Sequence, residues 1–146
     1  MKPRHVIYLS GTGVVLYTCD RTRYVPVSGY ELPDGDPAAL VSCLRQTPAA
    51  VVAIVVDVLE EDHNRDTLPR LARRDQDAML ARKLARMFPR TAYRTAAIQG
   101  RLPDDPQASR VLLSGLSRAD HLRALQELLA EARLRVSTVC SPALLS

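Results

Sequence analysis

Residues 5–17 have the sequence HVIYLSGTGVVLY, which predicts two strands joined by a tight turn. The apolar runs VIYL and VVLY flank the tetrapeptide SGTG at 10–13, whose small and polar residues favour a turn. A third strand is predicted near 23–32, where Pro26 and Gly29 indicate an edge strand or a bulge. Three consecutive strands with short turns predict an antiparallel meander.

The meander is followed by a predicted helix and by a strongly apolar strand. The helix begins with Asp36 as N-cap and Pro37 at the first helical position, and Pro48 ends it. Its apolar stripe consists of Leu40, Val41 and Leu44. Residues 50–59 (AVVAIVVDVL) then form a run rich in β-branched residues, typical of a parallel strand buried on both faces. The order βββαβ opens the ribonuclease H-like and actin-like folds, so the predicted fold class is mixed α/β.

A second group of elements is predicted after residue 60. They are a polar loop at 60–66, a helix at 75–88, strands at 91–102 and 109–116, a helix opened by a Ser117–Asp120 capping box, and a strand at 134–139. The first of these helices carries Leu80, Leu84, Met87 and Phe88 on one face, and the second carries Leu122, Leu125, Leu128, Leu129 and Ala132. The sequence therefore predicts a partial actin-like core at 1–60 and a small α+β subdomain at 61–146.

The amino-acid composition argues against several classes of function. The chain has 146 residues, 47% of them hydrophobic, so it can bury an ordinary core. Aromatic residues make up only 4%, with no Trp, which argues against base or carbohydrate stacking. Cys19, Cys43 and Cys140 are odd in number and lack ligand spacing with the histidines. They are predicted to be buried free thiols in a reducing compartment.

No targeting or membrane-spanning segment is recognisable. The N-terminus runs into a strand without the apolar region of a signal peptide, and no apolar run approaches about 20 residues. The sequence therefore predicts a soluble cytoplasmic chain. Its apolar end, CSPALLS at 140–146, is compatible with a truncation inside a larger protein or with a short docked C-terminus.

The first turn is a candidate phosphate site. Its residues are Ser10, Gly11, Thr12 and Gly13. Their backbone N–H groups could cradle a phosphate. The alternative is a hairpin turn in which glycine supplies a positive φ. We favour the turn, because it leads into a strand rather than into the N-terminus of a helix.

An acidic segment is a candidate metal site or docking surface. Its carboxylates are Asp57, Glu60, Glu61 and Asp62. Two-metal sites of ribonuclease H-like nucleases also need a carboxylate on the first strand, and residues 6–9 have none. A solvated loop is therefore favoured, and no metal site is predicted. Ser114-Gly115 lacks the context of a nucleophile elbow, Cys140 has no base near it in sequence, and no catalytic residue is predicted.

An arginine-rich stretch follows at 70–94. Its basic residues are Arg70, Arg73, Arg74, Arg82, Lys83, Arg86, Arg90 and Arg94. Asp75 and Asp77 are its only acids, and Arg82, Lys83 and Arg86 lie largely off the apolar face of the helix. The stretch is either an ordinary solvated face or a basic surface for an acidic protein, anionic lipid or nucleic acid. Nucleic acid is the least favoured partner, because stacking aromatics are missing.

The order of these elements resembles the pilus-type actin-like ATPase family. That family includes the type IV pilus M protein and the cytoplasmic domain of the type II secretion L protein. The resemblance rests on residues 111–146 (VLLSGLSRADHLRALQELLAEARLRVSTVCSPALLS), with a strand, a helix, a strand and an apolar segment. The strand at 50–59, the pair Leu68-Pro69 and the helix after it resemble the passage into the family's inserted subdomain.

The resemblance also implies how a nucleotide would be held. Nucleotide-binding members carry an Asp on the first strand, before a small-residue turn that wraps phosphate. Here Tyr8 stands where the Asp is expected, although the turn is kept. A hard cation needs such an oxygen ligand, and the family's second phosphate turn and adenine pocket would lie beyond Ser146. The resemblance therefore implies no cofactor, and ATP with Mg²⁺ only if the site survives.

By resemblance, the chain is expected to be a non-catalytic scaffold. Such domains bind the assembly ATPase and inner-membrane assembly proteins at the inner face of the inner membrane, and they often self-associate. The basic residues 70–90 and the acidic residues Glu60, Glu61 and Asp62 would offer charge-complementary docking surfaces. The alternatives are a nucleotide-binding actin-like ATPase or metal-dependent hydrolase, and a nucleic-acid-binding module.

Overall fold

The first three strands form the predicted meander. The strands are β1 (His5–Ser10), β2 (Gly13–Asp20) and β3 (Arg23–Glu31). Both β1–β2 and β2–β3 are antiparallel. In the computed structural model, which describes residues 4–47 and 51–144, β3 lies at one edge of its sheet. The pairing of β2 with β3 shifts register between Leu16, opposite Ser28, and Tyr17, opposite Pro26. This confirms the irregularity expected near Pro26.

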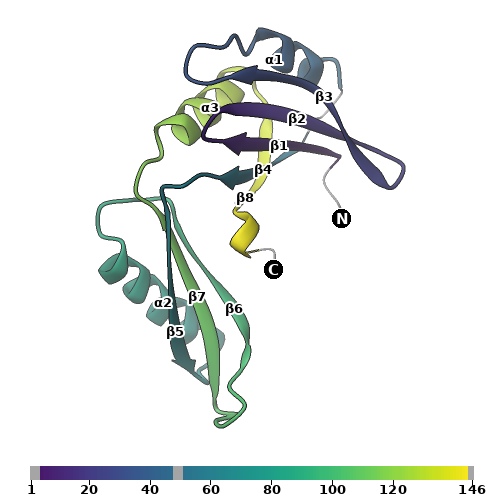
Figure 1. Cartoon of the computed structure of the whole chain (residues 1–146). Helices are drawn as coiled ribbons and strands as arrows, with labels where there is room; N and C mark the ends of the chain where they lie inside the picture. The colour runs from purple at the N-terminus through teal and green to yellow at the C-terminus, as the bar shows by residue number, and fades with distance from the viewer. Residues whose placement is uncertain (1–3, 48–50, 145–146) are drawn as a thin grey trace. The chain divides into compact units, whose positions relative to one another are not determined.

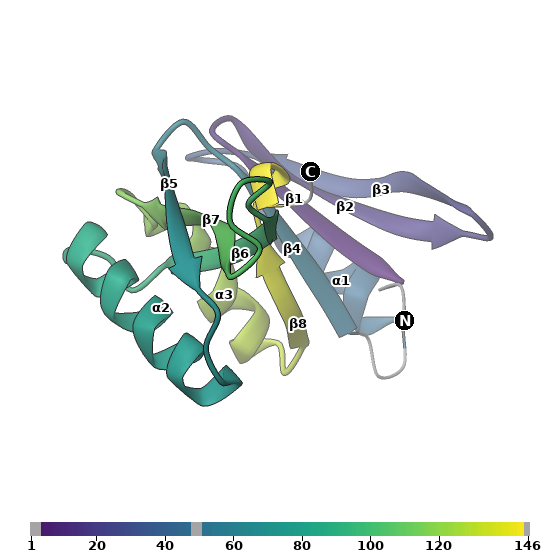
Figure 2. The same ribbon diagram turned by 90° about the horizontal axis from the view of Figure 1, so that it is seen from below.

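The sheet continues with two parallel strands. The elements that complete it are α1 (Ala38–Arg45), β4 (Val51–Asp57), α3 (Asp120–Glu131), β8 (Arg135–Cys140) and the 3-10 turn η1 (Pro142–Leu144). The strand order is β3-β2-β1-β4-β8, and β4 is parallel to both of its neighbours (Figure 1). The right-handed crossover rule places α1 and α3 on the same face of the sheet, as Figure 2 shows.

Alternate side chains along the strands are buried and form the core of this sheet. Ile7, Leu16 and Ile54 are register neighbours and each is at most 1% exposed. The two helices contribute the predicted buried residues Leu40, Val41, Leu44, Leu122, Leu125 and Leu129. Asp36 accepts a hydrogen bond from the Ala38 N–H at 2.9 Å, but the N-cap of α1 is Pro37, one residue later than predicted. The predicted strand at 50–59 is too long, since it ends at Asp57 and Leu59 is fully exposed.

A second sheet has three strands and one helix. Its elements are β5 (Glu61–Pro69), α2 (Arg73–Met87), β6 (Arg94–Arg101) and β7 (Ala108–Leu116). The order is β5-β7-β6 and all pairs are antiparallel. Leu68, Val111 and Leu113 form its buried core, against which Leu80, Leu84 and Phe88 of α2 pack with Met79 and Ala96. Met87 of the predicted apolar face is instead 41% exposed.

The chain divides into two compact units at places other than those predicted. The first unit contains residues 1–59 and 120–146, and the second contains 60–119. The second subdomain was expected to extend to residue 146. Instead the chain returns to the first unit at Asp120, because β8 pairs with β4. Each unit is therefore described by itself.

Three further expectations need comment. Ser117 is not the N-cap of α3, which begins three residues later; its hydroxyl donates to the Glu60 carbonyl at 2.9 Å instead. The thiols of Cys19, Cys43 and Cys140 are free, but each residue is only half-buried. Pro48 and Ala50, and Leu145 and Ser146 at the chain end, lie outside the described residues.

Candidate functional site

The turn between β1 and β2 is held by its own serine. The Ser10 Oγ accepts hydrogen bonds from the N–H groups of Thr12 at 3.3 Å and Gly13 at 3.2 Å. These are two of the N–H groups that the sequence offers to a phosphate, and here they already have an acceptor. Neither glycine of the turn adopts a positive φ, which corrects that part of the expectation. Gly13 is required for space, because an added Cβ would lie 3.0 Å from the Tyr30 carbonyl oxygen.

Tyr8 binds a carboxylate on the neighbouring strand. Its phenol donates a hydrogen bond to Asp57 Oδ2, and Asp57 is the register partner of Ser10 at the end of β4. This hydrogen bond raises the pKa of Tyr8, with burial and the Asp57 charge adding to it. The phenol therefore stays neutral and keeps the carboxylate of Asp57 bonded within the protein. β1 itself carries no acid, and the acid at the end of β4 is engaged by Tyr8.

The expected acidic loop is the strand β5. Successive residues of a strand point to opposite faces, so Glu61 and Asp62 cannot share one surface. The Glu61 side chain is only 8% exposed: Ser114 Oγ donates to its Oε1 at 2.5 Å, and His63 Nε2 lies 3.6 Å from its Oε2. The Glu60 carbonyl accepts from the N–H of Ser117 at 2.8 Å. The prediction of a solvated loop here is therefore wrong from Glu61 onward, and the docking role of Glu60, Glu61 and Asp62 stays a prediction.

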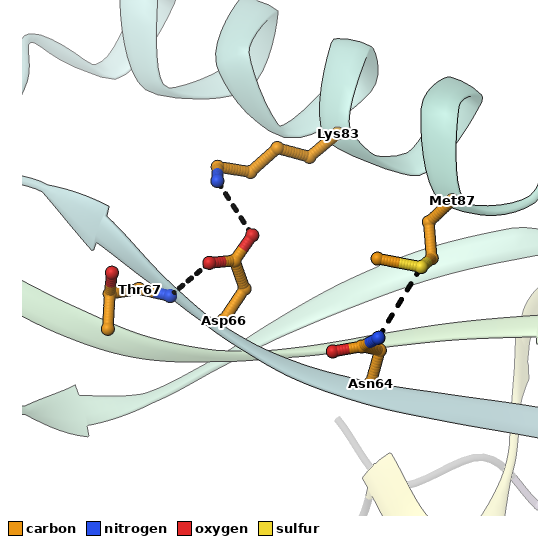
Figure 3. A network of polar contacts seen from close by, with 5 residues as sticks. All are labelled: Asn64, Asp66, Thr67, Lys83 and Met87. Atoms are coloured by element: carbon orange, nitrogen blue, oxygen red, sulfur yellow. Dashed lines mark hydrogen bonds and ion pairs between the residues drawn. The ribbon is translucent and has the colours of Figure 1, made fainter.

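Polar contacts attach α2 to β5 (Figure 3). Lys83 Nζ lies 2.7 Å from Asp66 Oδ2, and the N–H of Thr67 donates to Asp66 Oδ1 at 2.8 Å. The Lys83 bond is the main cause that lowers the pKa of Asp66, and the Thr67 bond is the next. Asn64 Nδ2 approaches Met87 Sδ at 3.4 Å on the same side of the sheet. Lys83 is therefore committed to the fold and offers less charge to a partner than the sequence suggested.

Of the remaining basic residues, one is hydrogen-bonded within the fold and the others are exposed. Arg94 Nη1 donates to the Phe88 carbonyl at 2.9 Å, just after the last turn of α2. The exposed arginines of the predicted surface are Arg70, Arg73, Arg74, Arg82, Arg86 and Arg90. None of these six belongs to an ion pair within the described residues. The structure thus places a set of uncompensated guanidinium groups on and beside α2.

An open hollow between α1 and α3 was not foreseen from the sequence. It encloses about 490 Å³ and is lined by residues that include Asp36, Val41, Arg45 and Leu128. Its lining comes mostly from residues 36–46, and Leu128 of α3 completes it. Among residues 4–47 and 51–144, no three His, Cys, Asp or Glu side chains are grouped so that they could hold a metal ion. No helix in the same ranges is long and apolar enough to span a membrane.

Solved structures share this arrangement of elements. The cytoplasmic domain of EpsL, an inner membrane component of the type II secretion system of Vibrio cholerae, matches with a TM-score of 0.53 and 14% identity. The match covers 94% of this chain and 56% of that one. A chain of the PilM-PilN type IV pilus biogenesis complex matches with a TM-score of 0.65 and 14% identity, covering 95% and 48%.

The chain has an actin-like fold. This confirms the fold class predicted from the order of the elements. The chain spans about half the length of each of these two structures, at 56% and 48%. No protein-family model matches it, and no curated protein matches it by sequence.

Proposed function

We propose that this chain is a non-catalytic scaffold domain of a bacterial type II secretion or type IV pilus-type assembly machine. In this role it recruits the assembly ATPase and inner-membrane assembly proteins on the cytoplasmic side of the inner membrane, with self-association allowed. Structural similarity to two solved proteins supports the proposal. EpsL is an inner membrane component of a secretion system, and PilM occurs in a pilus biogenesis complex.

The Tyr8–Asp57 hydrogen bond beside the closed Ser10 turn carries the non-catalytic part of the proposal. An actin-like ATPase needs a carboxylate for its metal and free N–H groups for its phosphates. Here the carboxylate of Asp57, the register partner of Ser10, accepts a hydrogen bond from Tyr8. The turn N–H groups of Thr12 and Gly13 donate to Ser10. On this proposal the domain works without nucleotide or metal.

A surviving nucleotide site is the second candidate. The observation in its favour is Asp57, whose carboxylate lies at the register position of Ser10, next to the small-residue turn. Opening the Tyr8 hydrogen bond would free an oxygen ligand there. A nucleic-acid module has less support, because the exposed arginines on α2 are not interleaved with aromatic side chains.

Calorimetry and a capture assay test the proposal together. We expect no heat of binding with ATP and Mg²⁺, and capture of the machine's assembly ATPase by the immobilised chain. Saturable ATP binding that disappears in Gly11→Val would establish the second candidate instead. Gly11 is the suitable position, since an added Cβ there meets nothing within 4 Å, whereas Gly13→Val would collide with Tyr30. A folded chain that captures no assembly ATPase contradicts the scaffold role.

A further inference from the structure

The outer face of α2 carries a seam of small residues. Met79, Leu80, Leu84 and Phe88 point to the sheet core. At about 100° per residue, Ala78, Ala81 and Ala85 point away from it. All three alanines are exposed. With Arg74 they follow the alternating spacing of four and three residues that a packed partner helix requires.

In the part of the chain that the structure describes, basic side chains border this seam outside any close ion pair. The pKa of Asp66, lowered mainly by the Lys83 hydrogen bond, is nevertheless lowered further by the charge of Arg86. Arg74, Arg82 and Arg86 are exposed and belong to no ion pair within the described residues. Asp75 lies on the same side as Arg82 and Arg86, and the exposed Asp77 borders the seam on its other side, so three basic side chains stand against two acidic ones. Lys83, by contrast, points to the sheet and pairs with Asp66. The outer face therefore has a net positive charge and small side chains along its centre.

We propose that the α2 seam, defined as Ala78, Ala81 and Ala85 bordered by Arg74, Arg82 and Arg86, binds an acidic amphipathic helix of a protein partner. The inference rests on the proposed scaffold function and names the surface and the chemistry of its partner. Alanines let two helix backbones approach to about 8 Å, the short end of the usual range. Arg82 and Arg86 lie along one side of the seam and Arg74 lies at its start, so their guanidinium groups reach carboxylates along one side and at one end of the partner helix.

Three other occupants fit the α2 seam less well. A second copy of α2 would bring the unpaired arginines of both chains together, which is repulsive. An anionic membrane would meet no large apolar side chain on the seam to insert below the headgroups. A single-stranded nucleic acid would find no aromatic side chain there on which to stack its bases. An acidic helix uses both the charges and the small residues.

The α2 seam is also rigidly supported. The Lys83–Asp66 pair, the Asn64–Met87 contact and the Arg94–Phe88 bond fix the inner side and the C-terminal end of α2 to the strands. The atoms in these three contacts are 2.7, 3.4 and 2.9 Å apart, and the residues of α2 and its C-cap that make them, Lys83, Met87 and Phe88, lie within the last two turns. A helix held in this way presents its outer face without further ordering, which lowers the entropic cost of docking.

The test uses a labelled Glu/Ala-rich peptide of about 20 residues, long enough to be helical by itself. Fluorescence anisotropy compares the whole chain with the triple variant Arg74→Glu, Arg82→Glu, Arg86→Glu. The control triple, Arg101→Glu, Arg110→Glu, Arg118→Glu, makes the same change in net charge with exposed residues outside α2. We expect the seam triple to weaken binding about tenfold or more and the control to change it less than about threefold. Equal losses in both triples would overturn the proposal.

A second variant separates helix packing from simple attraction. Ala81→Lys adds a positive charge but fills the centre of the α2 seam. Close packing predicts weaker binding of the peptide, whereas attraction alone predicts tighter binding and would refute the packed helix. Arg82→Ala is the substitute if the triple variant does not fold, with an expected loss of about threefold. Binding to anionic phospholipid vesicles or single-stranded DNA that matches or exceeds peptide binding would also count against an acidic helix.

The inference and the proposed function can fail separately. If the assembly ATPase is captured equally by the wild-type chain and by the seam triple, the scaffold role stands and the α2 seam is not its site. If no assembly ATPase is captured but the peptide binds in a seam-dependent way, the seam stands and the proposed machine is wrong.

Discussion

Single residues determine how tightly each unit is packed, and Gly115 is one at which an aromatic ring leaves no room for a side chain. It lies in β7 beneath Phe88, and a Cβ added to it would approach the Phe88 Cγ to 2.6 Å and Cδ1 to 2.7 Å. A ring cannot yield as the end of a flexible side chain can. The pair Ser114-Gly115 therefore has a packing role here, and the glycine allows α2 to lie close to the sheet.

The first prediction concerns this contact. We expect Gly115→Ala to lower the free energy of unfolding by about 1–3 kcal/mol, the usual cost of overpacking. The measurement is chemical denaturation followed by circular dichroism. Gly11→Ala is the matched control, because its Cβ would meet nothing within 4 Å. Combining Gly115→Ala with Phe88→Leu should recover part of the loss, and an unchanged or larger penalty in that pair would contradict this account.

His5 makes the first unit sensitive to acid. It is 4% exposed, its Nδ1 lies 3.2 Å from the Thr18 hydroxyl, and its Nε2 has no hydrogen-bond partner within the described residues. Burial, reinforced by the charge of Arg4, lowers the pKa of His5. Below about pH 6.5 His5 binds a proton in the unfolded chain but stays neutral in the folded chain. The free energy of unfolding therefore falls as the pH decreases.

This argument gives the second prediction. The melting temperature should fall between pH 7.5 and pH 5.5, and His5→Gln should reduce that fall. His121→Gln, an exposed position on α3, should leave it unchanged. A pH dependence that is identical in all three proteins would show that His5 does not cause it.

Helices and strands were predictable where a buried face places apolar residues at regular spacing in the sequence. The strand β5 has no such spacing and was not predicted. The meander, β4, α1 and α3 follow from apolar runs and stripes whose residues are indeed buried. In β5 (EDHNRDTLP) only Leu68 is buried, and the strand is held by pairing with β7 and by polar contacts to α2. Pairing with a distant strand leaves no local signal, so the segment resembles a loop. The acidic residues at its start were assigned to a loop for the same reason.

The C-terminal end of α3 supplies an element-scale prediction. The N–H of Leu134 donates to the Leu129 carbonyl and that of Arg133 to the Ala130 carbonyl, each at 2.9 Å. This is a Schellman motif with Arg133 at a φ of 59°. Arg133→Gly should raise the free energy of unfolding by about 1 kcal/mol, because glycine adopts this conformation without steric cost.

The matched control is Arg123→Gly, in the middle of α3. It should lower the stability by about 1 kcal/mol, the cost of glycine inside a helix. Chemical denaturation of both variants checks the pair. Two changes of the same sign would show that the backbone at Arg133 is unstrained.

The whole molecule is one unit with a second unit inserted between β4 and α3. The insertion starts and ends on paired strands, since Glu61 is the register partner of Leu116. Most of the buried apolar side chains described belong to the first unit. The place where the chain returns could not be predicted, because it depends on β8 pairing with β4 across the whole insertion.

Excision of the insertion is the prediction at this scale. Replacing residues 60–119 with a short Gly/Ser linker should leave a first unit that still unfolds cooperatively and keeps its circular dichroism signature. The reason is that the entry and exit of the insertion already lie side by side. The excised protein should no longer bind the acidic peptide. Loss of cooperative unfolding would show that the first unit depends on the insertion.

The pairing of β4 with β8 also has a consequence during synthesis. About 80 residues separate the two strands, and at about 5–20 residues per second a ribosome needs on the order of 4–16 s to make them. For that time the strand VVAIVVD has β1 on one side and a bare edge on the other. Such a strand is a template for misassembly between nascent chains. A trigger-factor-like or Hsp70-type chaperone that shields apolar segments on the ribosome should therefore raise the soluble yield of this chain.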